Sequence, residues 1–309
     1  MVGAILKLMR WPNLLMIAFI QYLIRHSLVL PLNLPHFLDD LDFFLLVFWS
    51  IIQAAGAYII NDILDQETDA INKPERITVA KHIRIGLAWN LFYATILISV
   101  AIAYYLSEKA AIGNLWLISP LSAILIYSYS ADLKRRAFIG NFSVALLSAI
   151  PLLLVAIFDI LPAATADNKD QVRQSMEVII AYSAFAFWTT LIREMVKDLE
   201  DREGDEKSGY QTLAILFSAK LNKALISLLL AVVIALAATY AISIWSADLS
   251  SALYILVAIL GFGLYLFQKL WQAQNANDFH KLSTQIKNFM LVGILSIPFF
   301  TLSLLLQWP

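Results

Sequence analysis

The sequence predicts an all-α fold, a polytopic membrane helical bundle with nine transmembrane helices and a cytoplasmic N-terminus. The 309 residues are 60% hydrophobic and only 15% charged, with a mean hydropathy of +0.73, which excludes an ordinary soluble globular protein. The apolar residues form long continuous runs and do not alternate with polar ones, so they favour helices over a transmembrane barrel. Lysine and arginine gather on alternate connections between these runs, as the positive-inside rule requires.

Nine apolar segments approach the length of about 20 residues that a helix needs to cross the hydrocarbon of a bilayer. They lie near residues 11–30, 42–61, 86–106, 113–131, 139–160, 176–195, 221–244, 250–271 and 288–307. No charge run or low-complexity linker divides the chain, so we expect a single transmembrane domain over residues 1–309. Two related halves within it would cover roughly residues 1–138 and 139–309.

The distribution of positive charge sets the expected orientation. With the N-terminus inside, 18 of the 22 Lys and Arg residues fall on the cytoplasmic side. The four on the opposite side are Arg25, Lys109, Lys169 and Arg173. We therefore expect an integral protein of the cell membrane. Cysteine is absent, which excludes thiolate catalysis, disulfides and iron–sulfur ligation.

An acidic pattern occurs twice in this apolar sequence. The first copy is Asn61-Asp62-x-x-Asp65-x-x-x-Asp69 and the second is Asp198-x-x-Asp201-x-x-x-Asp205. The intervals from 62 to 198, from 65 to 201 and from 69 to 205 are each 136 residues. On a continuous helix, positions i, i+3 and i+7 share one face, so each copy is expected to present three carboxylates in one direction. Four predicted helices separate the copies, which places both on the cytoplasmic side.

Six carboxylates near one membrane face repel one another and need compensating positive charge. Their hard oxygen atoms suit Mg²⁺, which shares its coordination between carboxylates, water and substrate phosphates. Several basic residues are predicted on the same cytoplasmic side as the acids and would suit an anion: Lys73, Arg76, Lys134, Arg135, Arg136, Arg193 and Lys197. Carboxylates, magnesium and cations at the mouth of an apolar bundle together indicate a site for a diphosphate with an apolar tail.

Residues 61–76 and 193–205 resemble the two signature motifs of the UbiA-type intramembrane prenyltransferases, and residues 10–13 (Arg-Trp-Pro-Asn) resemble the opening of the first helix in that family. The resemblance covers nearly the whole chain. Residues 133–135, 139–141, 197–201 and 209–213 look most similar to the geranylgeranylglycerol-phosphate geranylgeranyltransferase type within the family.

This resemblance implies a Mg²⁺-dependent enzyme that transfers an isoprenyl chain from an allylic diphosphate, such as geranylgeranyl diphosphate, to a lipid acceptor such as geranylgeranylglycerol phosphate. The implied metal ligands are Asn61, Asp62, Asp65, Asp69, Asp198, Asp201 and Asp205, and the catalytic residues among them are Asp62, Asp65, Asp198 and Asp201. The implied substrate-binding residues are Asn13, Arg76, Lys134, Arg193 and Lys197. No protein or nucleic-acid partner is expected, and the active site would face the cytoplasm.

Two alternatives remain at this stage. The isoprenyl acceptor could be an aromatic quinone precursor, because acceptor choice depends on the shape of the cavity. A cation-coupled secondary transporter would also carry acidic residues, but transporters place their coupling residues near the midplane of the membrane. The basic residues have simpler readings too: residues 134–136 suit a topology signal, and Arg193 and Lys197 could pair with neighbouring acids.

Overall fold

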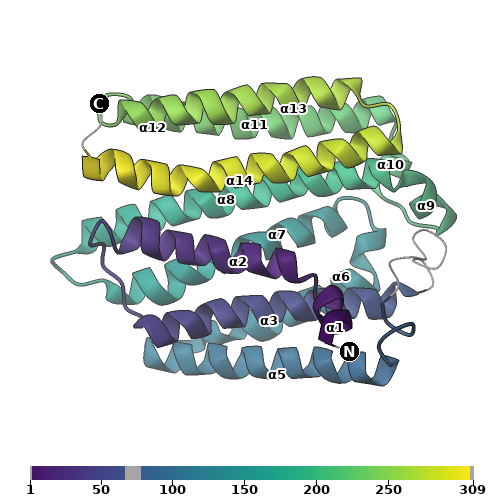
Figure 1. The fold of residues 1–309 in the computed structure, drawn as a ribbon, viewed down its shortest axis with the longest axis horizontal. Helices are drawn as coiled ribbons and strands as arrows, with labels where there is room; N and C mark the ends of the chain where they lie inside the picture. The colour runs from purple at the N-terminus through teal and green to yellow at the C-terminus, as the bar shows by residue number, and fades with distance from the viewer. Residues whose placement is uncertain (1, 67–77, 307–309) are drawn as a thin grey trace. The chain divides into compact units, whose positions relative to one another are not determined.

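The computed structural model describes residues 2–66 and 78–306. Within these residues the chain is helical, with no strand beyond the isolated bridges Val79–Ile83 and Arg136–Gln211 (Figure 1). The α-helices are α1 (Val2–Leu8), α2 (Trp11–Ile24), α3 (Asp40–Leu64), α5 (Ile85–Lys109), α6 (Ile118–Ala131), α7 (Ile139–Val155), α8 (Lys169–Glu200), α9 (Arg202–Lys207), α10 (Leu213–Leu216), α11 (Ala219–Ile244), α12 (Leu249–Tyr254), α13 (Gly261–Gln272) and α14 (Ala276–Leu306). The predicted all-α class is confirmed.

Seven helical segments of the described chain are long and apolar enough to span a membrane. They are Asp40–Leu64, Ile85–Lys109, Ile139–Ala163, Lys169–Glu200, Ala219–Ile244, Leu249–Gln272 and Ala276–Leu306. The two other predicted spans coincide with helix that the structure divides: the 14 residues of α2 continue into a π-helical turn at Arg25–Val29, and the 14 residues of α6 follow a 3-10 helix at Gly113–Leu117. The count of nine and the cytoplasmic N-terminus stay predictions.

The helices expose apolar side chains and bury small polar ones. On α5, Leu97 is 73% exposed, whereas Thr95 and Ser99 are buried. On α13, Leu264 is likewise exposed and Gly263 is buried. Such a surface is costly in water but not in hydrocarbon, where helices pack through small and hydroxyl-bearing residues. The chain is therefore a polytopic membrane protein.

The described chain forms two compact units built from interleaved segments. Unit 1 contains residues 1–22, 35–134 and 150–180, and unit 2 contains residues 23–34, 135–149 and 181–309. In unit 1, α3 packs along α5 and α6, and a buried polar chain links them. The Gln53 side chain donates to the Ser119 carbonyl (2.8 Å), and the Ser119 hydroxyl donates to Ser99 (3.1 Å). The predicted relation between two sequence halves stays a prediction.

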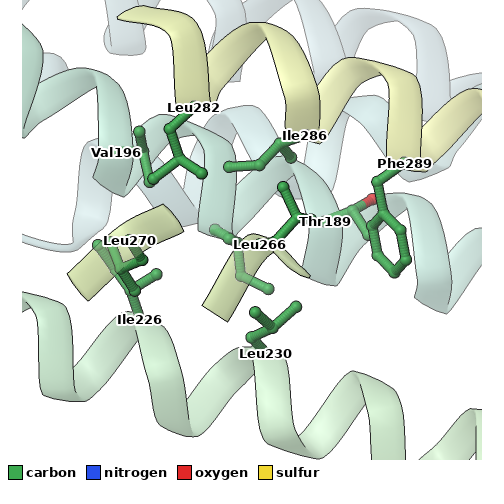
Figure 2. Close-up of a pocket in the computed structure, with 10 residues that line it drawn as sticks. Thr189, Val196, Ile226, Leu230, Leu266, Leu270, Leu282, Ile286 and Phe289 are labelled. Carbon is green, nitrogen blue, oxygen red and sulfur yellow. The ribbon is translucent and has the colours of Figure 1, made fainter. Parts of the chain in front are cut away.

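Unit 2 is organised around two long antiparallel neighbours, the second part of α8 and α14 (Figure 1). The Tyr182 hydroxyl lies 2.6 Å from the Ser296 hydroxyl, and near the other end His280 Nδ1 lies 2.8 Å from a Glu200 oxygen. With α11 and α13, these helices enclose an apolar interior. Figure 2 shows the ten side chains that line it, which are Ile192, Val196, Ile226, Leu230, Leu266, Leu270, Leu282, Ile286 and Phe289, together with Thr189.

Close packing of α8 on α14 depends on Gly293. A Cβ atom at this position would lie 2.3 Å from the Phe185 ring, which itself packs on Phe289 with 5.6 Å between ring centroids. We expect Gly293→Ala to lower the free energy of unfolding by about 1–3 kcal/mol because the core would be overpacked. Thermal unfolding in detergent checks this, with Gly261→Ala as the matched control.

Gly261 also lies in a helix, and nothing stands within 4 Å of its would-be Cβ. Gly261→Ala should therefore be neutral, or stabilising by up to about 1 kcal/mol through helix propensity. Equal melting temperatures for the two variants would contradict the assignment of Gly293 to a close helix contact.

Candidate active site

The two acidic motifs have the same local backbone. In the first, α3 ends at Leu64, Asp65 has φ −93° and ψ 4°, and its N–H donates to the Asn61 carbonyl at 2.9 Å. In the second, α8 ends at Glu200, Asp201 has φ −92° and ψ 5°, and its N–H donates to the Lys197 carbonyl at 2.8 Å. Both aspartates lie in the sparsely populated bridge region, which many active-site residues adopt. The sequence repeat is therefore also a repeat of local structure.

This turn corrects one expectation from the sequence. Because the helix ends at the second aspartate of the motif, the third does not continue on the same helical face. Asp205 lies in the separate short helix α9, where its N–H donates to the Asp201 carbonyl at 3.0 Å. The expected single face of three carboxylates is therefore wrong for the second motif. In the first motif Asp69 lies outside the described residues, as does the predicted substrate-binding residue Arg76.

In unit 1, both described carboxylates of the first motif are paired with cations. Asp62 accepts from the Arg10 guanidinium at 3.2 Å, and Asp65 pairs with the Lys134 ammonium group. The two carboxylate side chains are 13% and 14% exposed; the Lys134 side chain is largely buried beside its carboxylate, whereas the Arg10 side chain is 48% exposed. Lys134, predicted from the family resemblance to contact substrate, thus lies directly beside a predicted metal ligand.

Arg10 is held in place by its neighbours at the start of α2. Its guanidinium carbon lies 5.0 Å from the centre of the Tyr58 ring, an arrangement that favours a cation–π interaction. The Tyr58 hydroxyl accepts from the side-chain amide of Asn13 at 3.1 Å. Arg10 itself has φ 51°, the left-handed region that non-glycine residues seldom adopt. Sequence reasoning noted Arg10 and Asn13 as one motif but gave a role only to Asn13.

In unit 2, Asp198 is oriented by a residue from another helix. Its Oδ2 atom accepts from the side-chain amide of Asn141 at 2.9 Å, and Asn141 is buried on α7. Such a hydrogen bond fixes one oxygen of the carboxylate and directs the other. The sequence analysis quoted Asn141 as part of the family resemblance but did not assign it to the site, because nothing in the sequence places α7 beside Asp198.

Arg193 and Lys197, the two predicted substrate-binding cations of α8, share the carboxylate of Glu194, which was not predicted as a site residue. Arg193 donates to Glu194 at 3.0 Å, and the Lys197 ammonium group lies 2.9 Å from the second oxygen of Glu194. The Glu194 side chain is only 11% exposed. Ion pairing is therefore part of what these cations do, as one of the two readings anticipated. The sequence could have predicted the Glu194–Lys197 ion pair, because side chains three residues apart on a helix are neighbours.

The described carboxylates of each unit, taken separately, are of the type that binds Mg²⁺ together with water and substrate phosphates. Within residues 2–66 and 78–306, no three His, Asp or Glu side chains lie close enough together to hold a metal by themselves. Mg²⁺ usually binds through one or two carboxylates and completes its shell with water and substrate phosphates. Asp62 and Asp65 in unit 1, and Asp198 with its directed oxygen in unit 2, supply hard ligands of this type.

Comparison with known proteins decides the family. The model of the UbiA prenyltransferase family matches residues 15–293, most of the chain. The chain belongs to the UbiA prenyltransferase family. It is therefore an enzyme that transfers an isoprenyl group, and the family assigned from residues 61–76 and 193–205 is confirmed.

Relatives in the UbiA family extend over the full length of the chain. The digeranylgeranylglyceryl phosphate synthase of Methanosphaera stadtmanae is 28% identical over 295 residues, covering 94% of this chain and 96% of the relative. The enzyme of the same name from Saccharolobus solfataricus is 29% identical over 253 residues, covering 80% and 82%.

Solved structures share the UbiA fold. A digeranylgeranylglyceryl phosphate synthase structure aligns with a TM-score of 0.69 at 23% identity, covering 97% of this chain and 98% of the other. A UbiA homolog from Archaeoglobus fulgidus bound to GPP and Mg²⁺ aligns with a TM-score of 0.58 at 16% identity, covering 95% and 99%. At these identities the likeness shows the fold.

Proposed function

We propose that this UbiA-family prenyltransferase transfers a geranylgeranyl group from geranylgeranyl diphosphate to the free hydroxyl of geranylgeranylglyceryl phosphate. The observation that carries the proposal is full-length similarity to synthases of that product, with both acidic turns present. We place the reaction in the cell membrane with the active site at the cytoplasmic face, as the distribution of Lys and Arg favours.

The proposed metal is Mg²⁺, held by the acids of the two motifs with Asn61 in support. The proposed ligands are Asn61, Asp62, Asp65, Asp69, Asp198, Asp201 and Asp205. When bound, Mg²⁺ would stabilise the negative charge that collects on the leaving diphosphate. A family homolog bound to GPP and Mg²⁺ supports this choice of metal.

In the proposed step, the bond between the allylic carbon and the diphosphate oxygen breaks, and its electron pair leaves with the diphosphate. The acceptor hydroxyl oxygen then bonds to that carbon and loses its proton. Arg10 and Lys134, which pair with Asp62 and Asp65 in the structure, would contact the diphosphate when those carboxylates hold a metal. Asn13 and Arg76 are retained as proposed substrate-binding residues.

The remaining tasks are removal of the proton and exclusion of water. We assign the proton to a carboxylate of the second motif, where Asn141 orients Asp198. The apolar helices would keep water away from the allylic cation, because water would capture it as the alcohol.

A direct assay tests the proposal against its rivals. Purified protein is incubated with Mg²⁺, radiolabelled geranylgeranyl diphosphate and either geranylgeranylglyceryl phosphate or 4-hydroxybenzoate. We expect labelled digeranylgeranylglyceryl phosphate with the first acceptor and no product with the second. Product only with the aromatic acceptor would assign the chain to quinone-type prenylation. No product with either, together with ion-driven uptake into proteoliposomes, would favour the transporter reading.

A further inference from the structure

Lys287 on α14 is a charged residue that the reaction described so far does not use. It is an exposed residue eleven positions into α14, about 16 Å along the axis from Ala276 and directly before the apolar run predicted to begin at residue 288. Among the residues that the structure describes, no hydrogen bond or ion pair involves its ammonium group.

The packing of α14 on α8 places Lys287 opposite Arg193. The contacts between Glu200 and His280 and between Tyr182 and Ser296 define an antiparallel register for the two helices. Arg193 lies seven residues before Glu200, and Lys287 lies seven residues after His280, so the same register sets the two basic residues across from each other.

Lys197 completes the group. It stands one turn from Arg193 on α8, and both residues are close enough to Lys287 for their charges to repel it. We define these three residues, Arg193, Lys197 and Lys287, as the basic cluster of unit 2. Simple snorkelling would not bring a lysine toward two other cations, so the arrangement indicates that an anion belongs among them.

The positive charge of the basic cluster is only partly balanced. Glu194 is the one carboxylate in the described chain that hydrogen-bonds to it, through Arg193 and Lys197. The Nε atom of Arg193 is buried and has no hydrogen-bond partner among the described residues. Glu194 bridges two of the three cations, and Asp198 also lies within electrostatic range of Lys197, so the cluster keeps a net positive charge and an unused donor.

The basic cluster and the proposed metal ligand Asp198 project from different sides of α8, although Lys197 stays within electrostatic range of Asp198. Successive residues of a helix are about 100° apart, so Arg193 and Lys197 lie about 100° around α8 from Glu194 and Asp198. On the other side of the cluster, Val196 and Ile286 line the apolar interior of unit 2 (Figure 2). These apolar side chains cover one side of the cluster, whereas Lys287 itself is exposed.

We propose that Arg193, Lys197 and Lys287 bind the phosphate monoester of the acceptor lipid, separately from the diphosphate of the donor. The proposal rests on the proposed function, in which the acceptor carries such a phosphate. It makes the basic cluster a determinant of acceptor choice, because an acceptor without a phosphate gains nothing from it. Lys287 is the new member, and neither motif contains it.

The test compares three variants of the full-length protein in detergent. Lys287→Met removes the charge but keeps an unbranched side chain, and Lys287→Arg keeps the charge. Lys281→Met is the matched control, because Lys281 is an exposed lysine of the same helix about 120° away around its axis. Thermal unfolding establishes that all three remain folded.

We expect Lys287→Met to raise the KM for geranylgeranylglyceryl phosphate about tenfold to a hundredfold, the usual cost of one charged hydrogen bond. The KM for geranylgeranyl diphosphate should stay within about twofold of wild type. Lys287→Arg should restore most of the acceptor affinity, and Lys281→Met should resemble wild type. An unchanged acceptor KM, or a rise in the donor KM instead, would overturn the proposal.

Direct binding separates this inference from the proposed function. Calorimetry with geranylgeranylglyceryl phosphate, with its dephosphorylated alcohol and with inorganic phosphate needs no turnover. Tighter binding of the phosphorylated lipid than of the alcohol, lost in Lys287→Met, would support the basic cluster even if the wild-type protein failed to prenylate that lipid. Equal binding of the lipid and its alcohol would overturn the cluster while leaving any observed turnover intact. Binding of inorganic phosphate as tight as the lipid would show recognition of a free anion and would also overturn it.

Discussion

Asp198→Ala is expected to lower kcat/KM for prenyl transfer by a factor of about 10³ or more. Loss of this carboxylate removes a proposed metal ligand and leaves the buried amide of Asn141 without its acceptor. Removing one preorganised group that stabilises transition-state charge typically costs about 10²–10³, and loss of metal affinity adds to this. Steady-state assays with geranylgeranyl diphosphate at saturating acceptor measure the effect.

The matched control for Asp198→Ala is Glu206→Ala. Glu206 is an exposed acid of α9, one residue beyond the second motif, so its loss tests whether any nearby negative charge matters. Activity of this variant should remain within about twofold of wild type, as expected for a surface substitution. Near-normal turnover by a folded Asp198→Ala protein would remove the second motif from the reaction.

Chelation of divalent cations is expected to abolish product formation. Without Mg²⁺, Arg10 and Lys134 stay paired with Asp62 and Asp65, so the charge on the leaving diphosphate is not stabilised. Activity in excess EDTA should fall by at least about 10³-fold, and excess Mg²⁺ should restore it. Product formation is followed by thin-layer separation of the labelled lipid.

The melting temperature tests whether chelation stops the reaction simply by unfolding the protein. The melting temperature of the protein should change little with EDTA alone, because Arg10 and Lys134 already neutralise Asp62 and Asp65 without metal. Adding a non-hydrolysable prenyl diphosphate together with Mg²⁺ should raise it, since a ligand that binds only the folded state stabilises that state. Full activity in excess chelator would defeat the proposed mechanism.

Much of the fold followed from simple physical rules. Apolar runs of the length of a bilayer predicted the spanning helices, and seven of them meet that test in the described chain. The predictions at 11–30 and 113–131 illustrate the limit of the approach. Hydropathy measures how well a segment suits hydrocarbon, but it does not show where the backbone leaves the α-helical hydrogen-bond pattern, as it does at Arg25 and before Ile118.

The acidic repeat was likewise predicted in part: the sequence identified its residues but not the backbone turn that they adopt. Its spacing of 136 residues identified both motifs, and the matching dihedral angles at Asp65 and Asp201 show that the repeat has a structural basis. In the second motif the expected shared face was wrong because it assumed an unbroken helix. A one-residue departure into the bridge region ends each helix, and neither composition nor periodicity signals it.

By itself, the sequence determined the membrane class, the family and the acids on which the chemistry depends, because these follow from composition and from local spacing. Only the tertiary structure decided which residues stand beside those acids. Arg10 at Asp62, Asn141 at Asp198 and Lys287 opposite Arg193 are brought together by helices remote in the chain. Such contacts depend on the register and rotation of packed helices, and those are set by side-chain packing over the whole interface.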